Sequence, residues 1–282
     1  KMKKIILDLL AVVGTIAFVS QTQAQGHYHL FVGADSTNQN GQLYFDDTQL
    51  TVGGPASDFV STLIYTNGGV YAGYYQPGGL TIAVLAQTPA NGGPVANAPA
   101  LGSWIFIRVV SVQGPPGGMF SYWETNATSP TFSVPVGTMD GTNSYLAGQN
   151  DGSPGSDPYG HIHGRAFNVN KPRLYTVGFQ AFDNSTNGAG GGPLQSPSDI
   201  YYFHWQAGVN IASLNVTNHT ATATFGATGG DSFVLQYNDD LTSTNWQTIG
   251  GSVEGDDHFH SVTDENATNS ARFYRVVGTV EE

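Results

Sequence analysis

The chain of 282 residues contains no cysteine and carries 9 Lys and Arg against 21 Asp and Glu, a formal net charge of −12. The lack of cysteine excludes disulfides, thiolate metal sites and cysteine nucleophiles, and the acidic balance makes nucleic acid and anionic lipid poor partners. Charged residues make up only 11%, whereas 37 glycines, 14 tyrosines and 15 phenylalanines indicate short strands separated by turns, and so an all-β protein.

Residues 1–25, "KMKKIILDLLAVVGTIAFVSQTQAQ", have the pattern of a bacterial secretory signal peptide, with lysines before an apolar run and small residues at the cleavage site. Cleavage after Ala24 or after Gly26 fits this pattern. An uncleaved anchor is the alternative, but Asp8 interrupts the apolar run, which is shorter than the ~20 residues that a membrane span needs. We expect no span after cleavage, a secreted, cell-surface or periplasmic protein, and 6 basic against 20 acidic residues (9 − 3 and 21 − 1).

The segment 26–208 contains ten predicted strands, each bounded by turn residues. In chain order they are residues 27–34, 42–47, 59–66, 70–75, 80–87, 103–113, 119–124, 161–169, 173–182 and 200–208. We expect loops at 88–102 and 141–160, and a glycine-rich insertion at 183–199. This number of strands predicts a β-sandwich of jelly-roll-like or immunoglobulin-like topology.

The composition shifts near Gly208, and residues 209–282 predict a second module of four to six short strands. Its "FVLQYNDDLTSTNWQTI" and "SVTDENATNSARFYRVV" resemble a small C-terminal β-module common on exported proteins of Verrucomicrobia-like bacteria, over most of residues 209–277. The resemblance implies a small fibronectin-III-like β-module and indicates no chemistry.

Five histidines of the first domain lie in three predicted strands: His27, His29, His161, His163 and His204. Residues i and i+2 of a strand point to one face, so each His-x-His pair presents two imidazoles together. Two such pairs on neighbouring strands would supply three or four nitrogens to one ion, and such a site suits Zn²⁺ or Cu²⁺. Taken alone, either pair is better explained by exposed strand histidines without a ligand role.

The motifs "GHYHLFVGADSTNQNGQLYF", "GHIHGRAFNVNKPRLYTVGFQA" and "YYFHWQAG" resemble bacterial surface-anchored domains of the choice-of-anchor M type, with relatives among exported PEP-CTERM proteins. The resemblance covers roughly residues 26–208 and implies a link to metal supply, zinc in particular, with the same five histidines as ligands. Two positions depart from the family pattern. Arg173 replaces the usual glycine after the proline, and the usual Trp after the second histidine pair is absent.

Two other functions remain open. A surface or matrix protein would bind glycans, cell-surface components or other copies of itself, and the aromatic residues Trp104, Trp123, Tyr74 and Tyr75 would form a sugar platform unless they belong to the core. A copper-dependent oxidase would need His27 as the mature N-terminus. No nucleophile elbow or glycosidase carboxylate pair is recognisable, so no catalytic residue is assigned.

Two weaker patterns carry alternatives. In "DDHFH", His258 and His260 form either a secondary metal site or a solvated hairpin turn. A loop rich in Gly and Ser could bind Ca²⁺ or be simply solvated, because its spacing matches no EF-hand. Its candidate ligands are Asp140, Asn143, Asp151 and Asp157.

Overall fold

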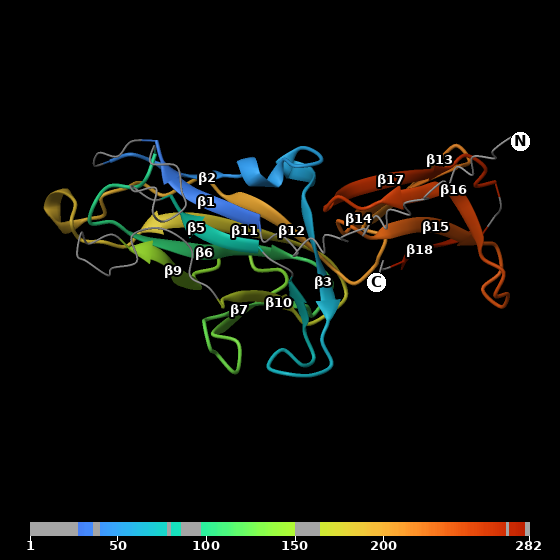
Figure 1. The fold of residues 1–282 in the computed structure, drawn as a ribbon, viewed down its shortest axis with the longest axis horizontal. Coiled ribbons are helices and arrows are strands. Elements are labelled where there is room, and N and C mark those ends of the chain that lie inside the picture. Colours follow the sequence, from blue (N-terminus) through green and yellow to red (C-terminus); the bar gives the residue numbers. More distant parts are fainter. Residues whose placement is uncertain are drawn as a thin grey trace, which may run out of the picture.

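The computed structural model describes residues 28–35, 40–77, 80–85, 97–149, 164–268 and 271–279. Within these ranges the chain forms the strands β1 to β18, arranged in four sheets (Figure 1). Strands β1 to β12 build two sheets, and β13 to β18 build two others. The all-β prediction is thereby confirmed, and the sheets are consistent with a β-sandwich followed by a smaller module of two sheets.

The smaller sheet of the first module has the order β2-β1-β5 (Leu43–Asp46, Tyr28–Ala34 and Leu80–Val84). β1 is antiparallel to β2 and parallel to β5. Leu30 and Val32 are fully buried, so every second side chain of β1 faces the core. The intervening side chains, including that of His29, therefore lie on the outer face of this sheet.

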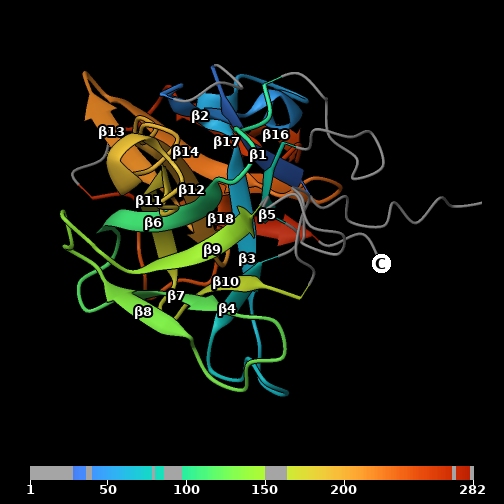
Figure 2. The same ribbon diagram turned by 90° about the vertical axis from the view of Figure 1, so that its left-hand side faces the viewer.

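The larger sheet has nine strands and curls over itself, with β6, β11 and β12 in one layer and β7, β8 and β10 in another (Figure 2). From edge to edge the strands are β8 (Phe132–Pro135), β7 (Met119–Trp123), β10 (Ala166–Val169), β4 (Tyr75–Pro77), β3 (Val60–Tyr65), β12 (Tyr201–Ala207), β11 (Arg173–Asp183), β6 (Trp104–Gln113) and β9 (Ser144–Gln149). The curl brings Tyr122 of β7 against Tyr145 of β9, with the ring centroids 4.1 Å apart.

Aromatic rings fill the space inside the curl. Phe120, Phe167, Phe179 and Trp205 come from four strands, and neighbouring rings lie 5.2–6.0 Å apart. Each of these side chains is at least 96% buried. Large aromatic rings of this kind dominate the apolar burial that stabilises a core.

One buried carboxylate holds the glycine-rich insertion between β11 and β12. The two oxygens of Asp183 accept hydrogen bonds from the backbone N–H groups of Trp104, Ser185, Leu194 and Gln195, at 2.7–3.2 Å. The Ser185 hydroxyl donates a fifth, at 3.0 Å. A segment with few apolar side chains is thus fixed to the sandwich by polar contacts.

The C-terminal module consists of two three-stranded sheets, drawn in orange and red in Figure 1. One sheet has the order β13-β14-β17 (Ser213–Thr217, Thr220–Ala227 and His258–Asp264), and the other β16-β15-β18 (Gln247–Glu254, Ser232–Asn238 and Phe273–Thr279). Phe225, Ala227 and Phe233 form its buried centre. Its six strands agree with the upper end of the predicted range.

Three details of the first module differ from the sequence prediction. The segment Ser144–Gln149, expected as loop, forms β9 beside β6. β8 was not expected, and most of the segment 70–75, expected as strand, is a turn that leads into β4. Among the residues described, no helix is long and apolar enough to cross a bilayer.

Candidate functional site

His29 lies on the outer face of β1, held by a glutamine. Its own backbone N–H donates to Gln49 Oε1 at 3.2 Å, and its Nδ1 lies 3.2 Å from the same oxygen. Because this oxygen only accepts hydrogen bonds, Nδ1 carries the ring proton and Nε2 carries the lone pair. The ring also stacks on Phe31, with the centroids 5.4 Å apart. The imidazole is therefore fixed in both tautomer and orientation.

His204 lies on the outer face of the other sheet. Its neighbours in β12, Phe203 and Trp205, are buried in the core, so alternation directs His204 away from it. Its Nδ1 is 2.9 Å from Thr176 Oγ1. Burial lowers the pKa of His204, and the negative charge of Asp58 only partly opposes this effect. The ring is thus kept neutral.

The structure describes only two of the five histidines of the predicted metal site, His29 and His204. His27, His161 and His163 lie outside the described residues. His29 and His204 lie on the outer faces of two sheets that pack together through the same core, so one ion cannot bind both. Among the residues that are described, no three His, Asp or Glu side chains are grouped closely enough to hold a metal.

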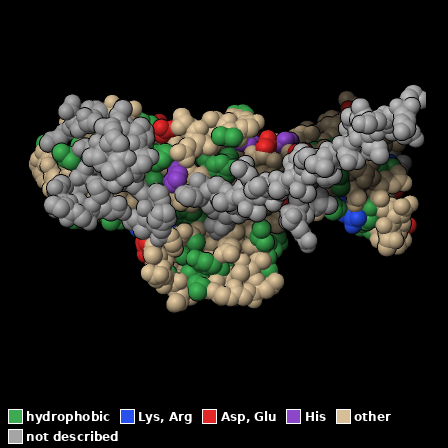
Figure 3. Space-filling model, in the orientation of Figure 1, with side chains coloured by type: hydrophobic (Ala, Val, Ile, Leu, Met, Phe, Trp, Pro, Cys, Tyr) green, Lys and Arg blue, Asp and Glu red, His purple; other side chains and the backbone are tan. Residues whose placement is uncertain are grey.

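His258 and His260 lie at the start of β17, where the two modules meet. His258 is only 3% exposed, so the solvated turn predicted for this segment is wrong at that residue. His258 Nδ1 is 2.8 Å from the carbonyl oxygen of Asp256, and His260 Nε2 is 2.8 Å from the Asp256 carboxylate. In Figure 3, histidine and acidic side chains reach the surface together between the modules.

Polar contacts join the modules around this turn. Tyr28 donates from its hydroxyl to the Asp257 carboxylate at 2.6 Å, and the backbone N–H of Val60 donates to the Asp257 carbonyl at 2.8 Å. Gln206, fully buried, accepts from the backbone N–H of Gly226 at 3.0 Å. Burial raises the pKa of Tyr28, and the hydrogen bond to Asp257 raises it further, so the phenol remains a donor.

Ring packing completes the same junction. Phe59 meets His258 edge to face, with centroids 5.6 Å apart, and His204 meets Phe259 in the same way at 5.6 Å. The backbone of Gly54 lies so close that an added Cβ would be 2.8 Å from His258 Cδ2. His204 and His258, both predicted as ligands, therefore have packing roles between the modules.

The aromatic residues of the predicted sugar platform do not share one surface, and the predicted calcium loop is only partly described. Trp123 is 2% exposed, with Tyr74 packed edge-on against it, whereas Trp104 is 42% exposed on another strand, so no shared sugar platform includes both tryptophans. Asp140 and Asn143 are exposed in the segment between β8 and β9, and the other two candidate calcium ligands, Asp151 and Asp157, lie outside the described residues.

A groove of about 660 Å³ lies in the C-terminal module between β13 and β18. Its walls include four exposed apolar side chains, those of Val209, Leu214, Leu241 and Phe273. Within the described part of the chain neither wall strand has a second neighbour: β13 pairs only with β14, and β18 only with β15. The groove therefore combines exposed apolar surface with two open strand edges.

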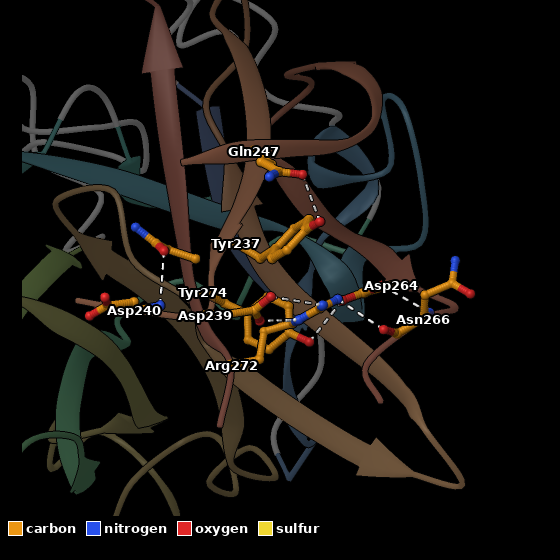
Figure 4. Close-up of polar contacts among 9 residues, drawn as sticks. Tyr237, Asp239, Asp240, Gln247, Asp264, Asn266, Arg272 and Tyr274 are labelled. Atoms are coloured by element: carbon orange, nitrogen blue, oxygen red, sulfur yellow. Dashed lines mark hydrogen bonds and ion pairs between the residues drawn. The ribbon is translucent and has the colours of Figure 1, made fainter. Parts of the chain in front are cut away.

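Three arginines line this groove, although the sequence has only six Lys and Arg residues after residue 25. Arg272 is engaged: it binds Asp239 at 2.7 Å and Asp264 at 2.8 Å, as the close-up in Figure 4 shows. Burial would raise the pKa of Asp264, but hydrogen bonds from Arg272, the backbone of Asn266 and Tyr274 lower it overall. This cluster forms a fixed polar end of the groove.

The other two arginines have no carboxylate partner among the described residues. Arg275 stacks on Trp246, with its guanidinium carbon 4.2 Å from the ring centroid, and donates to Gln236. Arg173, at the start of β11, has a φ of +127°, a strained value for any residue but glycine. The sequence marked Arg173 as unusual, but no local pattern indicated the groove or the contacts between His29 and Gln49.

No protein-family model, curated protein or solved structure matches this chain.

Proposed function

We propose that the protein is an exported β-sandwich protein that binds one Zn²⁺ or Cu²⁺ ion through His29, for sequestration, delivery or structural stabilisation. The observation that carries the proposal is the pair of contacts to Gln49 Oε1, which leaves the lone pair of His29 on Nε2. Histidines that bind metals commonly donate their other N–H to an oxygen in this way, which fixes the ring and raises its basicity.

The remaining ligands of this proposal are His27, His161 and His163, the histidines of the same motifs. His204 is left out, because it lies across the core from His29. The signal-like segment 1–25 supports export, and the resemblance to surface-anchored domains supports a role outside the cell. Imidazole binds metal when neutral and has a free pKa of ~6.5, so affinity should fall steeply below about pH 6.

The test is the native intact mass and metal content of the protein secreted by its own host and purified without chelator. We expect one zinc or copper per chain, lost in His29→Ala and in the double variant His161→Ala, His163→Ala. Gln49→Leu should weaken metal affinity by about 10- to 100-fold, because it removes the oxygen that orients the ring. His204→Gln is the matched control and should retain the metal.

Each result has a definite meaning. A metal-free wild type contradicts metal binding, and full metal content in His29→Ala contradicts the site. Loss of metal in His204→Gln would restore the larger ligand set. A mature chain that begins at His27 and carries copper would favour the oxidase instead, because its terminal amine could then join the imidazole as a ligand.

A structural component of the cell surface or matrix is the second candidate. The buried junction favours it, because contacts such as Gln206 to Gly226 fix the two modules in one orientation. The melting temperature measured with and without EDTA distinguishes the two functions. A metal-binding protein loses melting temperature in EDTA, whereas a structural protein that binds no metal keeps it.

A further inference from the structure

One face of β13 is uncovered. In its antiparallel register, Leu214 lies opposite Ala223 and Val216 opposite Ala221, so these pairs share a face of the sheet. Both alanines are fully buried between the two sheets, which makes this the inner face. Leu214 and Val216 nevertheless remain 45% and 57% exposed. The opposing sheet therefore stops short of them.

The missing cover corresponds to one strand beside β18. In an immunoglobulin-type sandwich, one sheet contains strands A, B and E, and the other contains C and F with a further strand G beside F. β13, β14 and β17 match the first set, and β15 and β18 match C and F. No described strand occupies the G position. The groove between β13 and β18 lies where that strand would pair.

The groove chemistry indicates what would fill it. An open strand edge offers backbone N–H and C=O groups that a peptide backbone satisfies and a polysaccharide does not. Arg173 and Arg275 line the groove without carboxylate partners among the described residues, in a chain that is strongly acidic overall. An acidic extended peptide complements both features.

The backbone of Arg173 is a second, independent observation. A residue at φ +127° costs of order 1–3 kcal/mol unless it is glycine, and such strain concentrates at functional positions. Arg173 makes no side-chain ion pair within the described chain that would offset this cost. A guanidinium kept at this position despite the strain is consistent with a carboxylate ligand in the groove.

We propose that the groove takes an extended acidic peptide segment of another protein, added as a strand to the open edge of β18. Its apolar residues, at alternate positions, cover Leu214 and Val216, and its carboxylates pair with Arg173 and Arg275. The proposal goes beyond metal binding and does not depend on it.

The test uses the full mature chain and a labelled nine-residue probe of sequence Glu-Val-Thr-Val-Glu-Val-Thr-Val-Glu. We expect saturable binding by fluorescence anisotropy and slower hydrogen exchange at alternate backbone amides of β18. A probe with proline in place of both the central Glu and the Val after it should bind at least about tenfold more weakly, because neighbouring N–H groups point to opposite sides of a strand and one of the two lost donors must face β18. A probe with Lys in place of Glu should lose a similar factor.

Variants of the groove provide the second arm. The double variant Leu214→Ser, Val216→Ser should weaken binding about tenfold through lost apolar contact. Ile64→Ser changes another exposed strand aliphatic, in the first module, and should bind as wild type does. Arg173→Ala and Arg173→Gly should each weaken binding about three- to fivefold. Of the two, only Arg173→Gly should raise the melting temperature, because glycine relieves the strain.

Three outcomes overturn the proposal. The first is no binding at probe concentrations up to about 1 mM. The second is equal binding of the proline probe, which shows contact without strand addition. The third is protection of β18 that rises with protein concentration alone, which identifies a second copy as the occupant. None of these variants changes a proposed metal ligand, so failure here leaves the metal proposal standing.

Discussion

Individual side chains in this protein derive their chemistry from the strand face on which they lie. His29 is oriented by an amide oxygen on the outer face of one sheet, whereas His204 is desolvated between β12 and the C-terminal module. The same residue type is thus oriented by a hydrogen bond in one place and kept neutral as a packing group in the other. The sequence predicted that both contribute to one metal site, but not that the core separates them.

His204 should make stability depend on pH. Its pKa is lowered by burial, while the unfolded chain has the ordinary value of ~6.5. Between these values the unfolded state binds more protons, so stability contributed by neutral His204 is complete above about pH 6.5 and is lost as pH falls through the folded pKa. Urea unfolding of wild type and His204→Gln at pH 5, 6 and 7.5 should show a shallower decline in the variant.

The control for this prediction is His219→Gln, because His219 is exposed in the β13–β14 turn. That variant should follow the wild-type curve. Parallel curves for wild type and His204→Gln would mean that His204 makes no contribution to the acid sensitivity of the fold.

At the level of elements, the start of β17 depends on a close approach by the loop before β3. Gly54 faces the ring of His258, which Phe59 also contacts edge to face. Glycine is therefore favoured at both position 53 and position 54, but for different reasons. Gly53 has a φ of +96°, which favours glycine, whereas Gly54 is required by the space that the ring takes.

Gly54→Ala should therefore destabilise the protein by about 1–3 kcal/mol, the usual cost of overpacking. An added Cβ would meet His258 Cδ2 at 2.8 Å, so either the ring or the loop must move. Chemical denaturation measures the change. Gly68→Ala is the matched control, since its Cβ would meet no atom within 4 Å. If both variants had the same free energy of unfolding, the His258 ring or the loop would be able to move aside without destabilising the protein.

The elements that the sequence predicts best are those with strong alternation. β6 and β11 were located to within a residue or two because buried and exposed side chains alternate along them. β9 was missed because the glycine and asparagine around Tyr145 and Ala147 resemble a loop, and only its pairing with β6 makes it a strand. The groove could not be predicted at all, since it depends on which side of β18 lacks a neighbour.

Over the whole molecule, the two modules form one unit, because hydrogen bonds and ring contacts cross a buried junction. Modules that share such a junction should unfold together. We therefore expect a single calorimetric transition for the wild type. The double variant Tyr28→Phe, Gln206→Leu removes contacts on the first-module side and should separate the melting into two transitions.

Tyr202→Phe changes an exposed tyrosine of the same strand as Gln206 and is the control. It should melt as the wild type does. Two transitions already present in the wild type would show that the junction does not couple the modules.

The parallel pairing of β3 with β12 also determines when the first module can form. Val60 is the register partner of His204, which lies 144 positions later in the chain (204 − 60). β3 and β4 therefore cannot join β11 and β6 until residue 207 has been synthesised, and contacts of such long range make folding slow. If the chain is exported as proposed above, this delay would be an advantage. Most of the polypeptide could then pass through an export channel in an extended state before its last central strand arrives to close the sandwich.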